Sequence, residues 1–185
     1  MTTVPLYVLV GPSGVGKGTV LKQLVARYPQ LQLSISATTR PSRPGEVDGR
    51  DYFFISDEQF DRLIAEDRLL EWAVVHKKYR YGTPADWVRE RQDEGRVVLL
   101  EVDLDGARQV MRRLPDTHGI FLAPPSWKEL EKRLLGRATE DAAEQSRRLQ
   151  TAKAEMAAVG EFETVIVNVD VNSTVQELAQ TLGLN

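Results

Sequence analysis

The sequence predicts an α/β fold in which a parallel five-stranded sheet is flanked by helices. Short apolar or β-branched runs alternate with longer stretches of helical composition, which is typical of a parallel sheet covered by helices. The first apolar run leads into a glycine-rich turn, GPSGVGKGT, and a helix-like stretch follows directly. Residues 37–94 interrupt the alternation with turn-rich sequence, which predicts a smaller lobe inserted into the core.

The expected core strands are short, apolar and rich in β-branched residues. We place them at residues 7–10, 33–36, 97–102, 119–122 and 164–167. Helices are expected at residues 16–28, 105–114, 127–135, 142–159 and 173–182. Two helix starts carry a reciprocal capping pattern, Ser126 with Glu129 and Ser173 with Gln176, so these serines are expected to be structural.

The inserted segment opens with TTRPSRPGEVDGRDY and continues through strand-like pieces at residues 53–55, 69–75 and 79–81. Its glycine and proline content, together with a small sheet of its own, predicts a lobe that carries a second, mobile substrate site. Another irregular piece, residues 136–144, joins two helices and is dense in charge.

Length and composition narrow the class of protein. A chain of 185 residues is expected to form one compact domain. A formal net charge of −3 argues against general nucleic-acid binding, and the lack of cysteine excludes disulfides and thiolate metal sites. No apolar run approaches the roughly 20 residues that span a bilayer, and the N-terminus lacks a signal-peptide pattern. We therefore expect a soluble, cytoplasmic protein with no nucleic-acid or membrane partner.

The glycine-rich turn has the residue types that bind a polyphosphate. Backbone amides converge on an anion most easily where no side chain intervenes, and a lysine adds positive charge at the start of the next helix. The turn therefore predicts a nucleotide phosphate site, and a glycine-rich hairpin or helix start without a ligand is the alternative. Its residues are Gly11, Pro12, Ser13, Gly14, Val15, Gly16, Lys17, Gly18 and Thr19.

One position departs from the usual phosphate-loop pattern. Gly18 stands where a serine or threonine usually offers a hydroxyl to magnesium, and the hydroxyl comes one residue later, at Thr19. We therefore expect Mg²⁺ to be held mostly by phosphate oxygens and water, with Asp103 as the candidate protein ligand.

Arginines and tyrosines of the inserted segment form a candidate site for a second phosphate. Arg40 and Arg43 flank a turn, where each guanidinium can bind a phosphate with two hydrogen bonds. The hydroxyls of Tyr52 and Tyr81 can donate to the same oxygens. The alternative for both arginines is a solvated loop charge.

Glu71 is a carboxylate within the apolar run LLEWAVV. A buried acid is costly unless it is paired, so Glu71 either has an arginine partner or binds a ligand with donors. A carboxylate accepts from two adjacent N–H groups, as guanine presents at N1 and N2, whereas adenine presents an acceptor there. Ser36 and Thr83 are expected to help read the base, and helix capping is the rival role for Thr83.

Further charged residues complete the candidate site. Glu101 and Asp103 end the strand VVLLEVD, where carboxylates beside a phosphate loop orient magnesium or its waters; capping of the next helix is the alternative. Arginines around the charged connector can neutralise the charge that develops in phosphoryl transfer, and Arg147 is the one most expected to be a surface charge. They are Arg133, Arg137, Arg147 and Arg148.

Together these motifs resemble the guanylate kinase family over nearly the whole chain. The segments that carry the resemblance are GPSGVGKGT, SATTRPSRPGEVDGRDYFF, LEWAVV, YRYGTP, LLEVDLDGA, FLAPPS, RLLGRATE and VIVN, in the family's order. The resemblance implies a P-loop NTPase core at about 1–36 and 95–185. It also implies a GMP-binding lobe at about 37–88 and a lid at about 137–150.

The resemblance also implies roles for single residues. Asn168 matches a position near the ATP adenine, and the transferred phosphate is handled at the positions of Lys17, Arg133, Arg137 and Arg148. The GMP-side positions are Ser36, Arg40, Arg43, Tyr52, Glu71, Tyr81, Thr83, Glu101 and Asp103.

The expected function is ATP-dependent phosphorylation of GMP to GDP, with Mg²⁺ accompanying ATP. Two rivals remain: a kinase of the same architecture that acts on a ribose bisphosphate, and a catalytically silent guanylate-kinase-like module that binds partner proteins. The base-reading pair of Glu71 and Ser36 argues against the first, and the intact Lys17 argues against the second. The sequence leaves open whether the protein is a monomer or a homo-oligomer.

Overall fold

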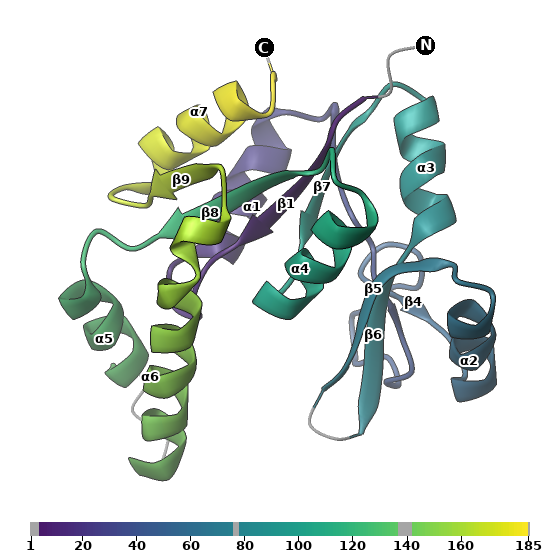
Figure 1. Ribbon diagram of the computed structural model, residues 1–185, viewed down its shortest axis with the longest axis horizontal. Coiled ribbons are helices and arrows are strands. Elements are labelled where there is room, and N and C mark those ends of the chain that lie inside the picture. The colour runs from purple at the N-terminus through teal and green to yellow at the C-terminus, as the bar shows by residue number, and fades with distance from the viewer. Residues whose placement is uncertain (1–3, 76–77, 137–141, 185) are drawn as a thin grey trace.

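A parallel five-stranded sheet forms the central layer of the computed structural model, which describes residues 4–75, 78–136 and 142–184 (Figure 1). The strand order is β2-β7-β1-β8-β9, and each neighbouring pair is parallel, so the predicted sheet is confirmed. The strands are β1 (Leu6–Val10), β2 (Leu31–Leu33), β7 (Val97–Glu101), β8 (His118–Ala123) and β9 (Thr164–Val167).

Helices cover both faces of this sheet, and the central strand β1 is therefore buried along its whole length. Because side chains alternate along a strand, Leu9 packs in the cluster with α1 and α7, while Val8 packs in the cluster with α3 and α4. This burial fixes the chain just before the glycine-rich turn. The helices are α1 (Lys17–Arg27), α3 (Ala85–Asp93), α4 (Leu104–Arg113) and α7 (Val171–Thr181).

Two further helices, α5 (Trp127–Leu135) and α6 (Ala142–Ala157), form a pair of their own at one side of the molecule (Figure 1). They share a small apolar cluster of Leu130, Leu134 and Ala152. A short 3-10 turn, η1 (Val159–Glu161), leads from α6 back to the core sheet at β9.

A second sheet of four strands stands on the opposite side from α5 and α6 (Figure 1). Its order is β4-β3-β6-β5, and α2 (Asp57–Ala65) packs on it through the fully buried Phe60. Its strands are β3 (Ala37–Thr38), β4 (Phe53–Phe54), β5 (Leu69–Val75) and β6 (Tyr79–Pro84).

The strand expected at residues 33–36 was placed wrongly, since β2 ends at Leu33. Beyond that point the chain leaves the core sheet, and the carbonyl of Ser36 accepts from Phe53 N at the second sheet. The polar residues 34–36 therefore form the passage between the two sheets.

The helices α2 and α3 were not predicted within the inserted segment. A signal for α2 was present in the sequence, because Ser56 and Gln59 form a capping box in which each side chain accepts from the other residue's backbone amide. The turn-rich composition around this helix concealed that pattern.

The predicted cap of the last helix was wrong, whereas the cap at Ser126 is confirmed by its hydrogen bond from Glu129 N. The helix α7 begins at Val171, and its N-cap is Asp170, whose carboxylate accepts from Asn172 N and Ser173 N at 2.9 and 3.0 Å. A carboxylate also interacts favourably with the positive end of the helix dipole. Ser173 therefore lies inside the helix and donates its hydroxyl back to Asp170.

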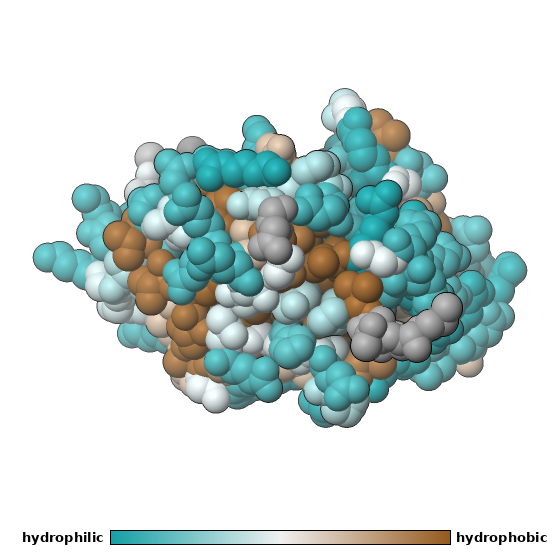
Figure 2. Space-filling model, turned by 90° about the horizontal axis from the view of Figure 1, so that it is seen from above, coloured by the Kyte–Doolittle hydropathy of each residue, from teal (hydrophilic) through white to brown (hydrophobic). Residues whose placement is uncertain are grey.

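Hydrophilic side chains cover most of the face seen from above, with apolar side chains showing between them (Figure 2). In the described part of the chain, we find no helix with the length and apolar character needed to cross a bilayer.

We expect Asp170→Ala to lower the melting temperature by about 2–4 °C, because it leaves two backbone amides of α7 without their acceptor. Ser173→Ala is the matched control and should have a smaller effect, since this serine is within the helix. Thermal denaturation followed by circular dichroism measures both. An equal effect of the two substitutions would contradict the assignment of Asp170 as the cap.

Candidate nucleotide site

The candidate residues of the core lie at the carboxyl ends of its parallel strands, where open α/β sheets bind their ligands. The glycine-rich turn follows β1, Glu101 ends β7, and Asn168 follows β9 directly. Residues of the turn and Glu101 line an open pocket of about 410 Å³. The lining residues are Pro12, Ser13, Gly14, Gly16, Lys17, Gly18, Thr19 and Glu101.

The backbone of the turn requires glycine at two positions. Gly14 and Gly16 have φ values of 83° and 103°, a region that side chains with a Cβ rarely adopt. At Gly11 the constraint is space, because a Cβ there would lie 2.5 Å from the carbonyl oxygen of Leu122. The turn therefore packs closely against β8 while it curves into α1.

The carbonyl oxygen of Val15 is the point at which the turn is attached to the rest of the core. It accepts from Asn168 Nδ2 at 2.8 Å and from Arg133 NH1 at 3.3 Å. In a trans peptide the carbonyl and the next N–H point in opposite directions. Holding the Val15 carbonyl toward Asn168 therefore turns the amide of Gly16 away from Asn168.

Asn168 is buried, and its side-chain oxygen accepts from Thr174 Oγ1 at 2.9 Å. Both ends of its amide are thus bonded within the protein, one to the glycine-rich turn and one to α7. These contacts make Asn168 a support of the turn.

Lys17 is half-buried and donates to the carbonyl of Gly11 across the turn. Burial lowers the pKa of Lys17, and the carboxylates of Glu101 and Glu155 oppose that shift. The ammonium group is therefore held within the pocket between backbone and carboxylate oxygens.

Glu155 is a site residue that sequence reasoning missed. It lies on α6, and its Oε2 accepts from Ser13 N at 3.3 Å, so a carboxylate contacts one backbone amide of the phosphate loop. Burial raises the pKa of Glu155, while the Ser13 amide and Lys17 lower it. No local pattern in the sequence indicates this contact, because 142 residues separate the two partners.

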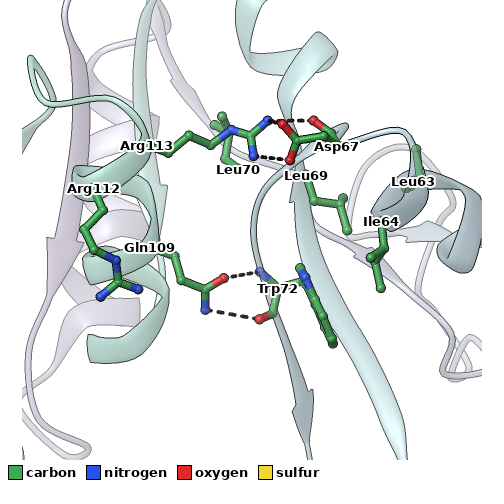
Figure 3. A pocket seen from close by; sticks show the side chains of 9 residues that line it. All are labelled: Leu63, Ile64, Asp67, Leu69, Leu70, Trp72, Gln109, Arg112 and Arg113. Atoms are coloured by element: carbon green, nitrogen blue, oxygen red, sulfur yellow. Dashed lines mark hydrogen bonds and ion pairs between the residues drawn. The ribbon is translucent and has the colours of Figure 1, made fainter.

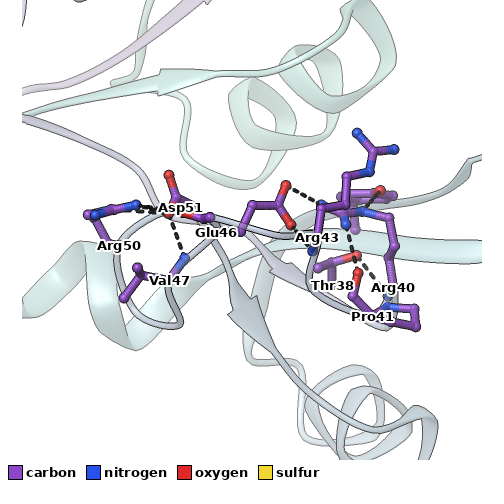
Figure 4. Close-up of polar contacts among 10 residues, drawn as sticks. Thr38, Arg40, Pro41, Arg43, Glu46, Val47, Arg50 and Asp51 are labelled. Carbon is purple, nitrogen blue, oxygen red and sulfur yellow. Dashed lines mark hydrogen bonds and ion pairs between the residues drawn. The ribbon is translucent and has the colours of Figure 1, made fainter.

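Arg40 lies at the centre of a polar cluster in the second sheet (Figure 4). Only 7% of it is exposed, so the alternative of a solvated loop charge is wrong for Arg40. Its Nε donates to the hydroxyl of Tyr81 at 3.1 Å, and its NH2 donates to Glu46 Oε1 at 2.8 Å. Hydrogen bonding to Glu46 raises the pKa of Arg40 further above its usual range.

Glu46 is the second residue that was missed, although it lies in the same turn as the two arginines. Its other oxygen accepts from the backbone amide of Arg43 at 2.7 Å. Tyr52 packs edge-on against Tyr81, with ring centroids 5.9 Å apart, and the guanidinium of Arg40 lies 5.4 Å from the Tyr52 ring. The predicted residues Arg40, Tyr52 and Tyr81 thus form one cluster, and Arg43 is joined to it through its backbone amide.

Glu71 is 8% exposed, and its partner is the buried hydroxyl of Thr83, which donates to Oε1 at 2.6 Å. The rival role of Thr83 was wrong, because the N-cap of α3 is Pro84 and no side-chain cap is formed there. Burial raises the pKa of Glu71, the hydrogen bond from Thr83 opposes this, and Asp103 adds to it. Glu71 is thus a buried carboxylate whose burial disfavours its charged form, and its Oε1 is bonded to Thr83.

Asp103 caps α4 by accepting from Gly106 N at 2.7 Å, so the capping alternative is confirmed for this residue. Among the described residues, no group of three or more histidine, aspartate or glutamate side chains is placed to hold a metal ion. Oxygen donors that suit Mg²⁺ do line the phosphate-loop pocket, at Thr19 and Glu101.

Electrostatic coupling joins the core and the second sheet. Burial raises the pKa of Tyr52, and the charge of Glu101, which also acts on Lys17, adds to that rise. Asp103 acts on both Glu71 and Glu155. The glycine-rich turn, through Lys17, and the Arg40 cluster, through Tyr52, therefore lie within electrostatic reach of one acid, Glu101.

The remaining predicted residues occupy less defined positions. Ser36 is half-buried between β2 and β3, and Arg43 is exposed at its turn. Arg148 is half-buried and Arg147 exposed, both on α6. Arg137 lies outside the described residues, as do residues 137–141 of the expected lid.

The core sheet is parallel, a glycine-rich loop follows its central strand, and a lysine begins α1. A second sheet carries a buried acid. These features define a P-loop protein of the nucleotide-kinase class. The sequence model of the guanylate kinase family matches residues 3–184. The chain belongs to the guanylate kinase family.

Relatives and a solved structure agree with this membership. The chain is 54% identical to a guanylate kinase of Leifsonia xyli subsp. xyli over 177 residues, which is 96% of this chain and 70% of the relative. It is also 54% identical to a guanylate kinase of Thermobifida fusca over 173 residues, 94% of this chain and 88% of the relative. The crystal structure of a guanylate kinase from Anaplasma phagocytophilum has a TM-score of 0.74 at 31% identity and covers 98% of this chain and 85% of its own.

The raised pKa of Glu71 predicts a pH-dependent cost to folding. Because its pKa is raised, the Glu71 carboxyl binds its proton more tightly in the folded state than in the unfolded state. Above the folded-state pKa the ionised carboxylate therefore lowers the stability of the fold. This loss of stability diminishes as the pH falls through the folded-state pKa. Glu71→Gln keeps an acceptor for Thr83 and removes the charge.

We therefore expect Glu71→Gln to raise the melting temperature by a few degrees at pH 7 to 8, with a smaller gain at pH 5. Thermal denaturation between pH 5 and pH 8 measures this difference, with Glu58→Gln on the exposed start of α2 as the control. A gain that is the same at every pH would show that the charge of Glu71 is not its source.

Proposed function

We propose that the chain transfers the γ-phosphate of ATP to GMP, giving ADP and GDP. The observation that carries this proposal is the buried carboxylate of Glu71 on the second sheet, in a chain whose core sheet ends in a glycine-rich loop with Lys17. One half of the site thus suits a polyphosphate and the other suits a base with two adjacent N–H groups. Membership of the guanylate kinase family supports the same pairing of substrates.

The ATP side of the proposed site is the phosphate loop, residues 11–19. The amides turned toward the pocket bind the phosphates, and Lys17 exchanges its contact with Gly11 for phosphate oxygens. Asn168 acts on this side by holding Val15 and thereby the shape of the loop. When ATP brings Mg²⁺, the ion supplies charge neutralisation, and Thr19, Glu101 and Asp103 are the residues that would hold its water shell.

The GMP side is the lobe of residues 37–88, together with Ser36 and the acids at the end of β7. Glu71 accepts from N1 and N2 of guanine, and Thr83 and Ser36 complete the contacts with the base. Arg40, Arg43, Tyr52 and Tyr81 bind the phosphate of GMP, which competes with Glu46 for the guanidinium of Arg40.

In the reaction, an oxygen of the GMP phosphate attacks the γ-phosphorus of ATP in line. The bond from that phosphorus to the β,γ-bridging oxygen breaks, and ADP leaves with the electron pair. The attacking oxygen is already anionic, so no general base is needed, and catalysis comes from positioning and charge neutralisation. We assign neutralisation to Lys17, Arg133, Arg137 and Arg148, with residues 137–150 acting as a lid that excludes water. A cytoplasmic location is part of this proposal.

The substrate test is release of ADP with GMP, AMP, CMP, UMP and a ribose bisphosphate in turn. We expect GMP to be used with the highest kcat/KM, since a site built to pair two N–H groups rejects a base that lacks them. Equal use of AMP would refute guanine recognition. Preference for the ribose bisphosphate would make the chain a sugar-phosphate kinase, and no turnover with any acceptor would favour a binding module.

We further expect Lys17→Met to reduce kcat with GMP by about 10²–10³-fold, because it removes a charge that stabilises the transferred phosphate. The KM for GMP should change little, since Lys17 belongs to the other half of the site. Lys22→Met, an exposed lysine on the same helix, is the control and should retain normal turnover. Steady-state kinetics at saturating ATP distinguish the outcomes, and full activity of Lys17→Met would remove its assigned role.

A further inference from the structure

The helix α4 of the core packs against strand β5 of the second sheet and also contacts the residues just before it. Gly106, Gln109 and Arg113 are spaced by three and four residues and so lie on one face of this helix. Figure 3 shows two of these contacts, in which Gln109 meets Trp72 and Arg113 meets Asp67. The residue before Trp72 is Glu71, to which we assigned recognition of the base.

The ladder between β5 and β6 does not fix Glu71 by itself. Its register shifts between Leu69 and Trp72, where β5 contains one more residue than β6. Glu71 lies inside this bulge, opposite Thr83. Bulges redirect side chains beside active sites, and the backbone on either side of the extra residue then needs another support.

Gln109 supplies that support with both ends of its side-chain amide. Its Oε1 accepts from Trp72 N at 3.1 Å, and its Nε2 donates to Trp72 O at 3.2 Å. In an antiparallel sheet, a neighbouring strand bonds the N–H and the C=O of one residue in the same way. The side chain of Gln109 therefore takes the place of a neighbouring strand at Trp72, the residue at which the bulge ends. One turn earlier, a Cβ at Gly106 would lie 3.2 Å from Glu71 Oε2, so the helix backbone also approaches the carboxylate closely.

We propose that Gln109 is a positioning residue for guanine recognition: it holds the bulge of β5 and thereby orients Glu71 toward the base. The inference rests on the proposed function. Gln109 acts through Trp72 and Glu71 and does not itself touch GMP. Its contact is separate from that of Arg113, which binds Asp67 ahead of β5 through Oδ1 and Oδ2 at 2.5 and 2.8 Å and attaches the lobe to the core there.

The test substitutes Gln109→Met, which keeps the length and packing of the side chain and removes both hydrogen bonds. We expect the KM for GMP to rise about tenfold, with the KM for ATP and kcat within about twofold. The preference for GMP over AMP should fall by the same factor. Gln109→Ala should give the same split if Met packs poorly, and circular dichroism confirms that each variant is folded.

Arg112→Ala is the matched control, because Arg112 lies on the same helix with its guanidinium turned away from Asp67 (Figure 3). It should leave both KM values unchanged. A Gln109→Met variant with reduced melting temperature but an unchanged KM for GMP and unchanged preference would overturn the inference, because Gln109 would then be only a structural tether.

A double-mutant cycle with Glu71→Gln tests the route of the effect. If Gln109 acts through Glu71, Gln109→Met should cost little further preference for GMP once the carboxylate is gone. An equal loss in both backgrounds would overturn the inference. The wild-type chain separates this result from the proposed function: lack of a GMP preference there refutes both, whereas a preference that Gln109→Met leaves intact refutes the inference alone.

Discussion

The attachment of the phosphate loop through the Val15 carbonyl is the constraint on which the rest of the site depends. One oxygen joins the loop to α5 through Arg133 and to the end of β9 through Asn168. Because β1 is buried on both sides, the loop is fixed at its start by the core and at its middle by this oxygen. The loop thus has its shape fixed by contacts within the protein, and such preorganisation reduces the entropy that binding must overcome.

The two halves of the site rest on different physical supports. The phosphate loop is held by its glycine backbone and by the buried amide of Asn168, which is bonded at one end to Val15 and at the other to Thr174. The acid on β5 is held at a bulge, by one hydroxyl and by a helix that belongs to the core. The proposed ATP side thus belongs to the central sheet, while the proposed GMP side lies where α4 meets the second sheet.

The sequence predicted those parts of the structure that have a local pattern. The core strands, the glycine loop and the acid within LLEWAVV all carry their signal within a few residues. Glu155 and Gln109 carry none, because they act on residues 142 and 37 positions away through single side chains. The last helix shows a third case, since the sequence pattern predicted Ser173 as its cap and the structure has Asp170, three residues earlier, in that position.

The pairing of Arg40 with Glu46 has a consequence for selectivity between nucleotides and nucleosides. A guanidinium that already holds a carboxylate is less costly to keep in an empty lobe than a bare charge. Glu46 also competes with a ligand anion for the guanidinium of Arg40. Because it lies only six residues from Arg40 in the chain, its effective concentration there is high. A ligand gains from this arginine only if its own anion displaces Glu46, so a phosphate dianion benefits and an uncharged nucleoside does not.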